Sequence, residues 1–123
     1  MTQPLEDRAY PTALDAMSRY HTDVVEQVQH AVANHPVVII GMAQNPHVRH
    51  ARKALQAANV EFEYIEFGSY LSQWKPRLAI KLWSGWPTYP QVFVQGKLLG
   101  GSNETRQALQ DGSLTQYLSN DSA

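Results

Sequence analysis

One short run of β-branched residues constrains the fold more than any other feature of the chain. Residues 37–40 read Val-Val-Ile-Ile, between His35-Pro36 and Gly41. A continuous apolar run of this length, bounded by turn residues, is typical of a strand that is buried on both faces of a sheet. Such a strand needs helices above and below it. The run therefore predicts an α/β fold with this strand at the centre.

The segments on either side of the run have helical spacing. Apolar residues recur every three or four positions from Asp23 to about Asn34. Asn45-Pro46 is typical of an N-cap followed by proline at the first helical position, and this helix is expected to run to Ala58. Residues 60–65 then alternate between apolar and acidic side chains, as a strand does. Strand, helix and strand in this order predict two parallel strands with a right-handed crossover.

The second half of the sequence predicts a helix, a β-hairpin and two further helices. The first helix ends at Trp83 with Pro76 near its start, and the hairpin turns at Gln95-Gly96. The remaining ranges are strands over 91–94 and 97–99 and helices over 102–110 and 114–118. We expect one domain over residues 22–118, preceded by an extension over 1–21 and followed by a tail over 119–123.

Composition excludes several classes of function. The 123 residues carry a formal net charge of -1, so no basic field favours nucleic acid or an anionic membrane as a partner. No apolar run approaches the roughly 18 residues of a membrane span, and the N-terminus lacks an export signal. We therefore expect a soluble, cytoplasmic protein. The chain has no cysteine, which excludes disulfides, thiolate metal ligands, a cysteine-held iron–sulfur cluster and any sulfur nucleophile.

Two short motifs are candidate binding elements. Residues 100–103 read Gly-Gly-Ser-Asn before a predicted helix, whose free N–H groups are suited to a carboxylate or phosphate. The alternative is that the glycines only turn the chain and Ser102 or Asn103 caps the helix. Residues 86–90 read Trp-Pro-Thr-Tyr-Pro directly before a strand, where a cis Pro90 would expose backbone groups. The alternatives are a trans Pro90 and a Trp86 that only packs.

His47 and His50 lie three residues apart on the predicted helix that begins at Pro46. This spacing allows two imidazoles to bind one metal ion or to serve a base-catalysed reaction. Neighbouring cations at Arg49, Arg52 and Lys53 oppose a metal ion, so a solvated basic helix face is the favoured interpretation.

Together these features resemble the glutaredoxins, and among them the monothiol glutaredoxin-like branch, over about residues 22–118. The strongest match is Trp-Pro-Thr-Tyr-Pro-Gln at 86–91, followed by Leu-Gly-Gly-Ser at 99–102. The resemblance implies a thioredoxin-like fold: a four-stranded mixed sheet with helices on both faces.

The resemblance also implies a set of residues that bind glutathione. Pro90 would be cis, and the Tyr89 backbone would pair with the cysteinyl residue of glutathione, with Thr88 beside it. Gly101, Ser102 and Asn103 would hold the γ-glutamyl end. Arg77 would bind the glycine carboxylate. Glutathione is then a ligand, and no resident cofactor is expected.

The sequence departs from the family where the reactive cysteine belongs. Residues 45–48 read Asn-Pro-His-Val, at the place of Cys-Pro-Tyr-Cys or Cys-Gly-Phe-Ser in the family. Met42 stands where the family usually has a lysine, and Asn103 replaces the usual acid. The 41–45 loop also lacks the longer insertion of the monothiol branch. An introduced Cys-to-Asn change alone would not account for Met42. These departures imply loss of thiol exchange with retention of the binding groove.

Three functions compete on this evidence. The preferred one is a redox-inactive protein that binds glutathione, or an extended peptide with a thiol or carboxylate, beside Pro90. The alternative is a scaffold in iron–sulfur or redox homeostasis that contacts a BolA-like partner or a second copy directly, through its N-terminal extension and without a cluster. The third is an enzyme that uses His47 or His50 as a base or metal ligand.

Overall fold

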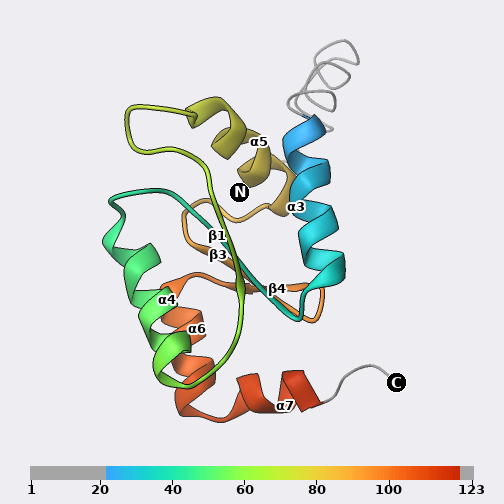
Figure 1. Cartoon of the computed structure of the whole chain (residues 1–123), viewed down its shortest axis with the longest axis vertical. Helices are drawn as coiled ribbons and strands as arrows, with labels where there is room; N and C mark the ends of the chain where they lie inside the picture. Colours follow the sequence, from blue (N-terminus) through green and yellow to red (C-terminus); the bar gives the residue numbers. More distant parts are fainter. Residues whose placement is uncertain (1–21, 120–123) are drawn as a thin grey trace, which may run out of the picture.

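A computed structural model describes residues 22–119 of the chain (Figure 1). Helices and strands alternate through most of this part, in the order that the hydrophobic pattern predicts. The elements are α3 (Thr22–Asn34), β1 (Val37–Gly41), α4 (Pro46–Ala57), β2 (Glu63–Glu66), α5 (Trp74–Ser84), β3 (Gln91–Val94), β4 (Lys97–Gly100), α6 (Ser102–Gln110) and α7 (Ser113–Ser119).

The four strands form one mixed sheet in the order β2-β1-β3-β4. β1 pairs with β2 in parallel and with β3 in antiparallel fashion, and β3 and β4 form the predicted hairpin. Gln95 and Gly96, which form its turn, both have positive φ (50° and 81°), as a two-residue hairpin turn requires. The thioredoxin-like fold is thereby confirmed.

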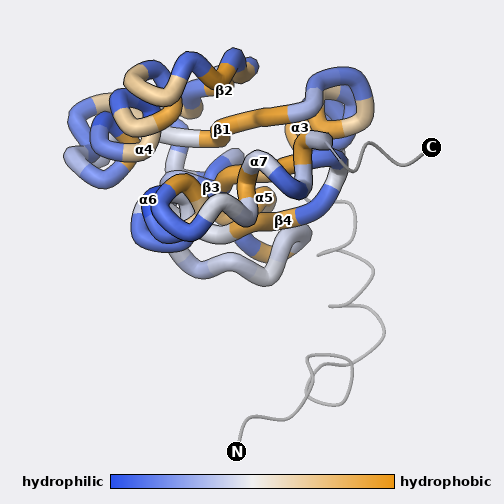
Figure 2. The backbone as a smooth tube through the Cα atoms, turned by 90° about the horizontal axis from the view of Figure 1, so that it is seen from below, coloured by the Kyte–Doolittle hydropathy of each residue, from blue (hydrophilic) through white to orange (hydrophobic). Residues whose placement is uncertain are grey.

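The central strand β1 separates two hydrophobic cores. Val38 and Ile40 face α3 and α5, whereas Val37 and Ile39 face α4, α6 and α7. All five residues of β1 are buried, which explains why its sequence has no polar position. Figure 1 shows α4 and α6 together on one side and α3 with α5 on the other, and in Figure 2 β1 is mostly orange, the colour of apolar residues.

The start of β2 differs from the sequence-based expectation, and α5 ends at Ser84, one residue beyond the expected Trp83. β2 begins at Glu63 and not at Val60, because the Val60 N–H donates to the Leu55 carbonyl at 2.9 Å and so stays with the end of α4. α5 begins at Trp74, with Pro76 as its third residue. A proline is tolerated there because the N–H groups of the first turn have no partner within the helix.

The expected extension over 1–21 and most of the expected tail (120–123) lie outside the described residues. α7 continues one residue beyond the expected domain end at 118. Within residues 22–119, no helix has the length and apolar character needed to cross a membrane.

Candidate functional site

Asn45 caps the helix that follows the central strand. Its side-chain Oδ1 accepts hydrogen bonds from the backbone N–H groups of His47 (2.9 Å) and Val48 (3.2 Å). Its backbone is extended and Pro46 is the first helical residue, as the sequence predicts. Asn45 is 8% exposed. The carboxamide thus occupies the N-terminal end of α4, where the helix dipole favours negative charge.

The peptide bond between Tyr89 and Pro90 is cis, the geometry that the resemblance implied. Ile40 pairs with Gln91, so Pro90 lies beside the end of β1, where the loop to Asn45 begins. The Tyr89 side chain is buried, and its hydroxyl donates to the Arg77 carbonyl at 2.6 Å. Burial also raises the pKa of Tyr89, against the opposing effect of the Arg77 charge. Since the tyrosine ring belongs to the core, only the backbone at this position is suited to a ligand.

Arg77 lies in the first part of α5 with its guanidinium turned inward. The residue is 7% exposed, and its Nη1 donates to the Phe67 carbonyl (2.9 Å) and to the Ser72 carbonyl (2.6 Å). These bonds fasten the loop between β2 and α5 to the helix. The sequence pointed to Arg77 only as a ligand contact, and the structure adds this bracing role.

Gly101 and Ser102 form the N-terminus of α6, directly after β4. The Gly101 N–H donates to Oε1 of Glu104 at 2.8 Å, so a carboxylate of the chain itself already meets one helix N-terminal donor. The Gly101 carbonyl accepts from the backbone and the hydroxyl of Thr105. Gly101, rather than Ser102 or Asn103, is the N-cap residue, so the alternative that one of those two polar side chains caps the helix is wrong.

Several buried polar atoms at this end of the molecule have no hydrogen-bond partner. Among residues 22–119 they include Trp86 Nε1, Gln91 Oε1 and Ser102 Oγ. A Cβ built on Gly101 would lie 3.5 Å from Trp86 Nε1 and 3.5 Å from the Pro90 carbonyl, so the tryptophan, the cis-proline and the start of α6 meet here. Buried polar atoms are almost always paired in native proteins. Each of these three atoms therefore lacks a partner that a ligand or water could supply.

Sequence reasoning used Gln91 only as the last residue of the 86–91 motif, not as a binding residue, and it favoured a packing role for Trp86. Gln91 is fully buried in β3, and its Nε2 donates to the Trp86 carbonyl at 3.0 Å. This bond joins the strand to the Trp-Pro segment and leaves Oε1 unpaired. A glutamine directly after a proline at the start of an apolar strand is the only local hint of such a role.

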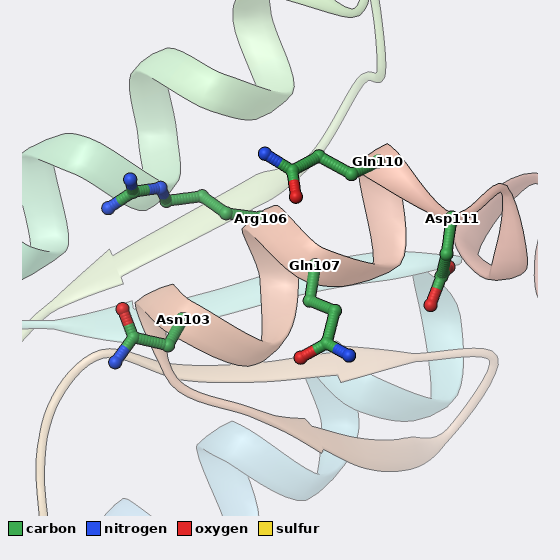
Figure 3. A pocket seen from close by; sticks show the side chains of 5 residues that line it. All are labelled: Asn103, Arg106, Gln107, Gln110 and Asp111. Carbon is green, nitrogen blue, oxygen red and sulfur yellow. The ribbon is translucent and has the colours of Figure 1, made fainter.

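Asn103, unlike its neighbour Ser102, is exposed. It lines a shallow hollow of about 440 Å³ along α6 together with Arg106, Gln107, Gln110 and Asp111. Figure 3 shows Arg106 extending towards α4, whereas Gln107 points to the opposite side of the helix. Thr88, the other exposed residue of the expected set, precedes Tyr89.

His47 and His50 lie edge to face on α4, with ring centroids 6.4 Å apart. In the described part of the chain, no three histidine, aspartate or glutamate side chains are grouped so that they could hold a metal ion. The geometry therefore adds no support to the metal-dependent alternative.

Comparison with known proteins identifies the family to which the chain belongs. The glutaredoxin family model matches residues 37–99, which are just over half of the chain. The chain belongs to the glutaredoxin family.

Similar proteins come from several organisms. A glutaredoxin-like protein of Dictyostelium discoideum is 48% identical over 98 residues, which are 80% of each chain. Monothiol glutaredoxin-S17 of Arabidopsis thaliana is 30% identical over 132 aligned positions, covering 96% of this chain and 25% of the relative. The crystal structure of oxidized glutaredoxin 2 from Chlamydomonas reinhardtii superimposes with a TM-score of 0.70 at 26% identity, over 81% of this chain and 94% of that one.

This glutaredoxin has no cysteine anywhere in its sequence. Met42, at the position where the resemblance placed a lysine, is buried in the core on the α3 and α5 side. The loop that precedes α4 thus carries an amide at Asn45 and an apolar side chain at Met42, with neither a thiol nor its cationic support.

Proposed function

We propose that this glutaredoxin is redox-inactive and binds glutathione, or an extended peptide with a thiol or carboxylate, in the groove beside Pro90. The observation that carries the proposal is the set of unpaired buried atoms Trp86 Nε1, Gln91 Oε1 and Ser102 Oγ next to the cis-proline. A ligand that reaches them supplies partners that the protein itself does not provide.

The absence of exchange chemistry follows from the side chain at the N-terminus of α4. Thiol–disulfide exchange needs a thiolate that attacks a disulfide sulfur. The carboxamide of Asn45 is not a nucleophile of this kind, and its Oδ1 is already engaged with two backbone N–H groups. The asparagine accepts the N–H hydrogen bonds that a thiolate would otherwise accept. The start of α4 is therefore stabilised although the reactive group is absent.

The backbone of Thr88 and Tyr89 is the part of the groove suited to an extended ligand. Because Tyr89 is anchored through its hydroxyl to α5, the backbone beside it is held in a fixed position. An extended peptide then pairs with this segment as an additional strand would, through backbone hydrogen bonds. Selection among extended ligands comes from the polar groups at the two ends of the groove.

The ends of the groove supply donors for two carboxylates. At one end, α6 offers the N–H groups of Ser102 and Asn103, since Glu104 already accepts from Gly101. At the other end, both loop bonds of Arg77 use Nη1, so Nη2 and Nε are the donors that remain for a ligand carboxylate. This distribution fits a short dicarboxylate such as glutathione.

The test is a titration of the full chain with reduced glutathione, followed by amide chemical shifts. We expect saturable shifts confined to the amides of residues 77, 88, 89, 91 and 101–103. A Gly101→Ala variant tests the location, because its methyl would stand 3.5 Å from both the Pro90 carbonyl and Trp86 Nε1, an ordinary contact that the fold tolerates. It should bind at least about tenfold more weakly, a loss of about 1.4 kcal/mol.

The control for this experiment is Thr115→Ala, an exposed change on α7 that should leave the affinity unchanged. A coupled assay for glutathione-dependent disulfide reduction should show no turnover above the rate without protein. Absence of shifts at millimolar glutathione would refute the binding, and turnover by this cysteine-free chain would refute the inactivity.

A further inference from the structure

The outer side of α5 exposes a row of large apolar side chains. Trp74, Leu78 and Leu82 are 57%, 39% and 47% exposed, and their spacing of four residues places them on one side of the helix. Leu71, just before the helix, is 97% exposed. We call these four residues the α5 stripe. Single exposed apolar residues are common, but a row of this kind marks a contact surface.

The charged residues of α5 itself are all positive, whereas α3, which packs against α5, exposes Asp23 and Glu26. The sequence has no aspartate or glutamate between Glu66 and Glu104, although the whole chain is slightly acidic. Lys75 and Lys81 belong to α5 itself, and the Lys75 ammonium lies 5.7 Å from the centre of the Trp74 ring. The stripe therefore favours an occupant that combines apolar anchors with carboxylates.

The chain has such a segment close to this surface. The described structure begins at Thr22, the first residue of α3, and Val24 of α3 shares a core cluster with Ile80 of α5. The 21 residues before Thr22 are long enough, since α5, with its 11 residues, spans only about 16 Å at 1.5 Å per residue. Residues 1–21 thus join the described structure at a helix that packs against α5, and their extended length exceeds that of α5.

The sequence of residues 1–21 matches the chemistry of the stripe. Tyr10, Leu14 and Met17 are four and three residues apart, the spacing of apolar residues on one side of a helix. Asp15 adjoins Leu14, and the segment has three acidic residues (Glu6, Asp7 and Asp15) against two arginines, Arg8 and Arg19. The same segment therefore carries both the apolar anchors and the carboxylates.

We propose that residues 1–21 dock on the α5 stripe through Leu14 and Met17, with Asp15 directed to the lysines of α5. Covalent attachment gives a docking segment an effective concentration in the millimolar range, so a weak contact is enough to hold it. In the docked arrangement Trp74 and Leu78 lose part of their exposed surface to this segment. The inference does not depend on glutathione binding.

The experiment measures how well the Trp74 side chain of the full chain is shielded from solvent. The indole N–H resonance of Trp74, assigned with Trp74→Phe, is followed while a soluble gadolinium chelate broadens exposed signals. The test variant is Leu14→Asp with Met17→Asp. The matched control is Thr12→Asp with Ser18→Asp, which adds the same charge to the same segment. The amide of Tyr117 on α7 serves as an internal reference.

We expect the broadening of the Trp74 signal to increase several-fold in the test variant and to stay at the wild-type value in the control. Equal broadening in all three proteins would overturn the proposal, because the segment would then leave Trp74 uncovered. Shielding that disappears on dilution, together with a doubled mass at high concentration, would also overturn it, since a second copy would then be the occupant.

Discussion

Replacing Asn45 with cysteine tests whether the N-terminal end of α4 still favours a thiolate. In the structure the Asn45 side chain receives two backbone N–H groups, from His47 at 2.9 Å and from Val48 at 3.2 Å. A thiolate at the same place would accept these hydrogen bonds and interact with the positive end of the helix dipole. We therefore expect the cysteine of Asn45→Cys to have a lowered pKa.

The magnitude follows from the helix terminus. A charge at this position gains about 0.3–2 kcal/mol from the dipole, and one pKa unit corresponds to about 1.36 kcal/mol. The ordinary cysteine pKa of about 8.5 should thus fall by about 0.2–1.5 units, to about 7–8.3. Burial of the site and the apolar Met42 nearby limit the decrease, because both disfavour the charged form.

The assay is the pH dependence of alkylation by iodoacetamide, read by mass spectrometry. Because the chain has no other cysteine, every modified molecule reports the introduced thiol. Gln107→Cys, exposed in the middle of α6, is the control and should titrate near the ordinary cysteine value. A pKa for Asn45→Cys equal to or above that of the control would refute the reasoning, since the helix terminus would then give no preference for a thiolate.

Three further changes test the scaffold. Arg77→Ala should lower the free energy of unfolding by about 1–3 kcal/mol in urea denaturation, because two loop carbonyls lose their buried donor, and an unchanged midpoint would contradict the bracing role. Gly41→Ala should lower the free energy of unfolding in the same assay, since the new Cβ would stand 2.7 Å from Cγ1 of Val48 in α4. A variant as stable as the wild type would contradict this, because α4 would then move aside without cost. Hydrogen bonds from Ser113 lower the pKa of Asp111 in the folded state, so their stabilisation is present above the unfolded carboxyl pKa of about 4 and is lost as the pH falls below it. Asp111→Asn should therefore lose less stability than the wild type between about pH 5 and pH 2, and identical pH profiles would contradict this origin.

Most of the fold is predictable from the sequence because its signals are local. The unbroken run at 37–40, the Asn45-Pro46 start of α4 and the Gln95-Gly96 turn each specify one element without reference to the rest of the chain. The start of β2 was predicted wrongly. Residues 60–62 have strand-like alternation, but the Val60 N–H is taken by Leu55, which no pattern of hydrophobicity reveals.

The candidate site is predictable only as a set of positions. The motif at 86–91 indicates where a ligand lies, and the cis bond before Pro90 agrees with it. Which of the polar atoms at these positions lack a hydrogen-bond partner depends on the tertiary structure. Arg77 is partly committed to the loop before α5, and the unpaired Oε1 of Gln91 results from a bond between its own amide and Trp86.

The central claim is that a glutaredoxin groove without its thiol retains the capacity to bind glutathione. A crystal structure of the wild-type chain soaked with reduced glutathione tests it most directly. The account predicts a non-covalent tripeptide along the Tyr89 backbone, with one carboxylate at the start of α6 and no bond to Asn45. An empty groove at millimolar glutathione, or a groove filled by the protein's own side chains, would contradict it.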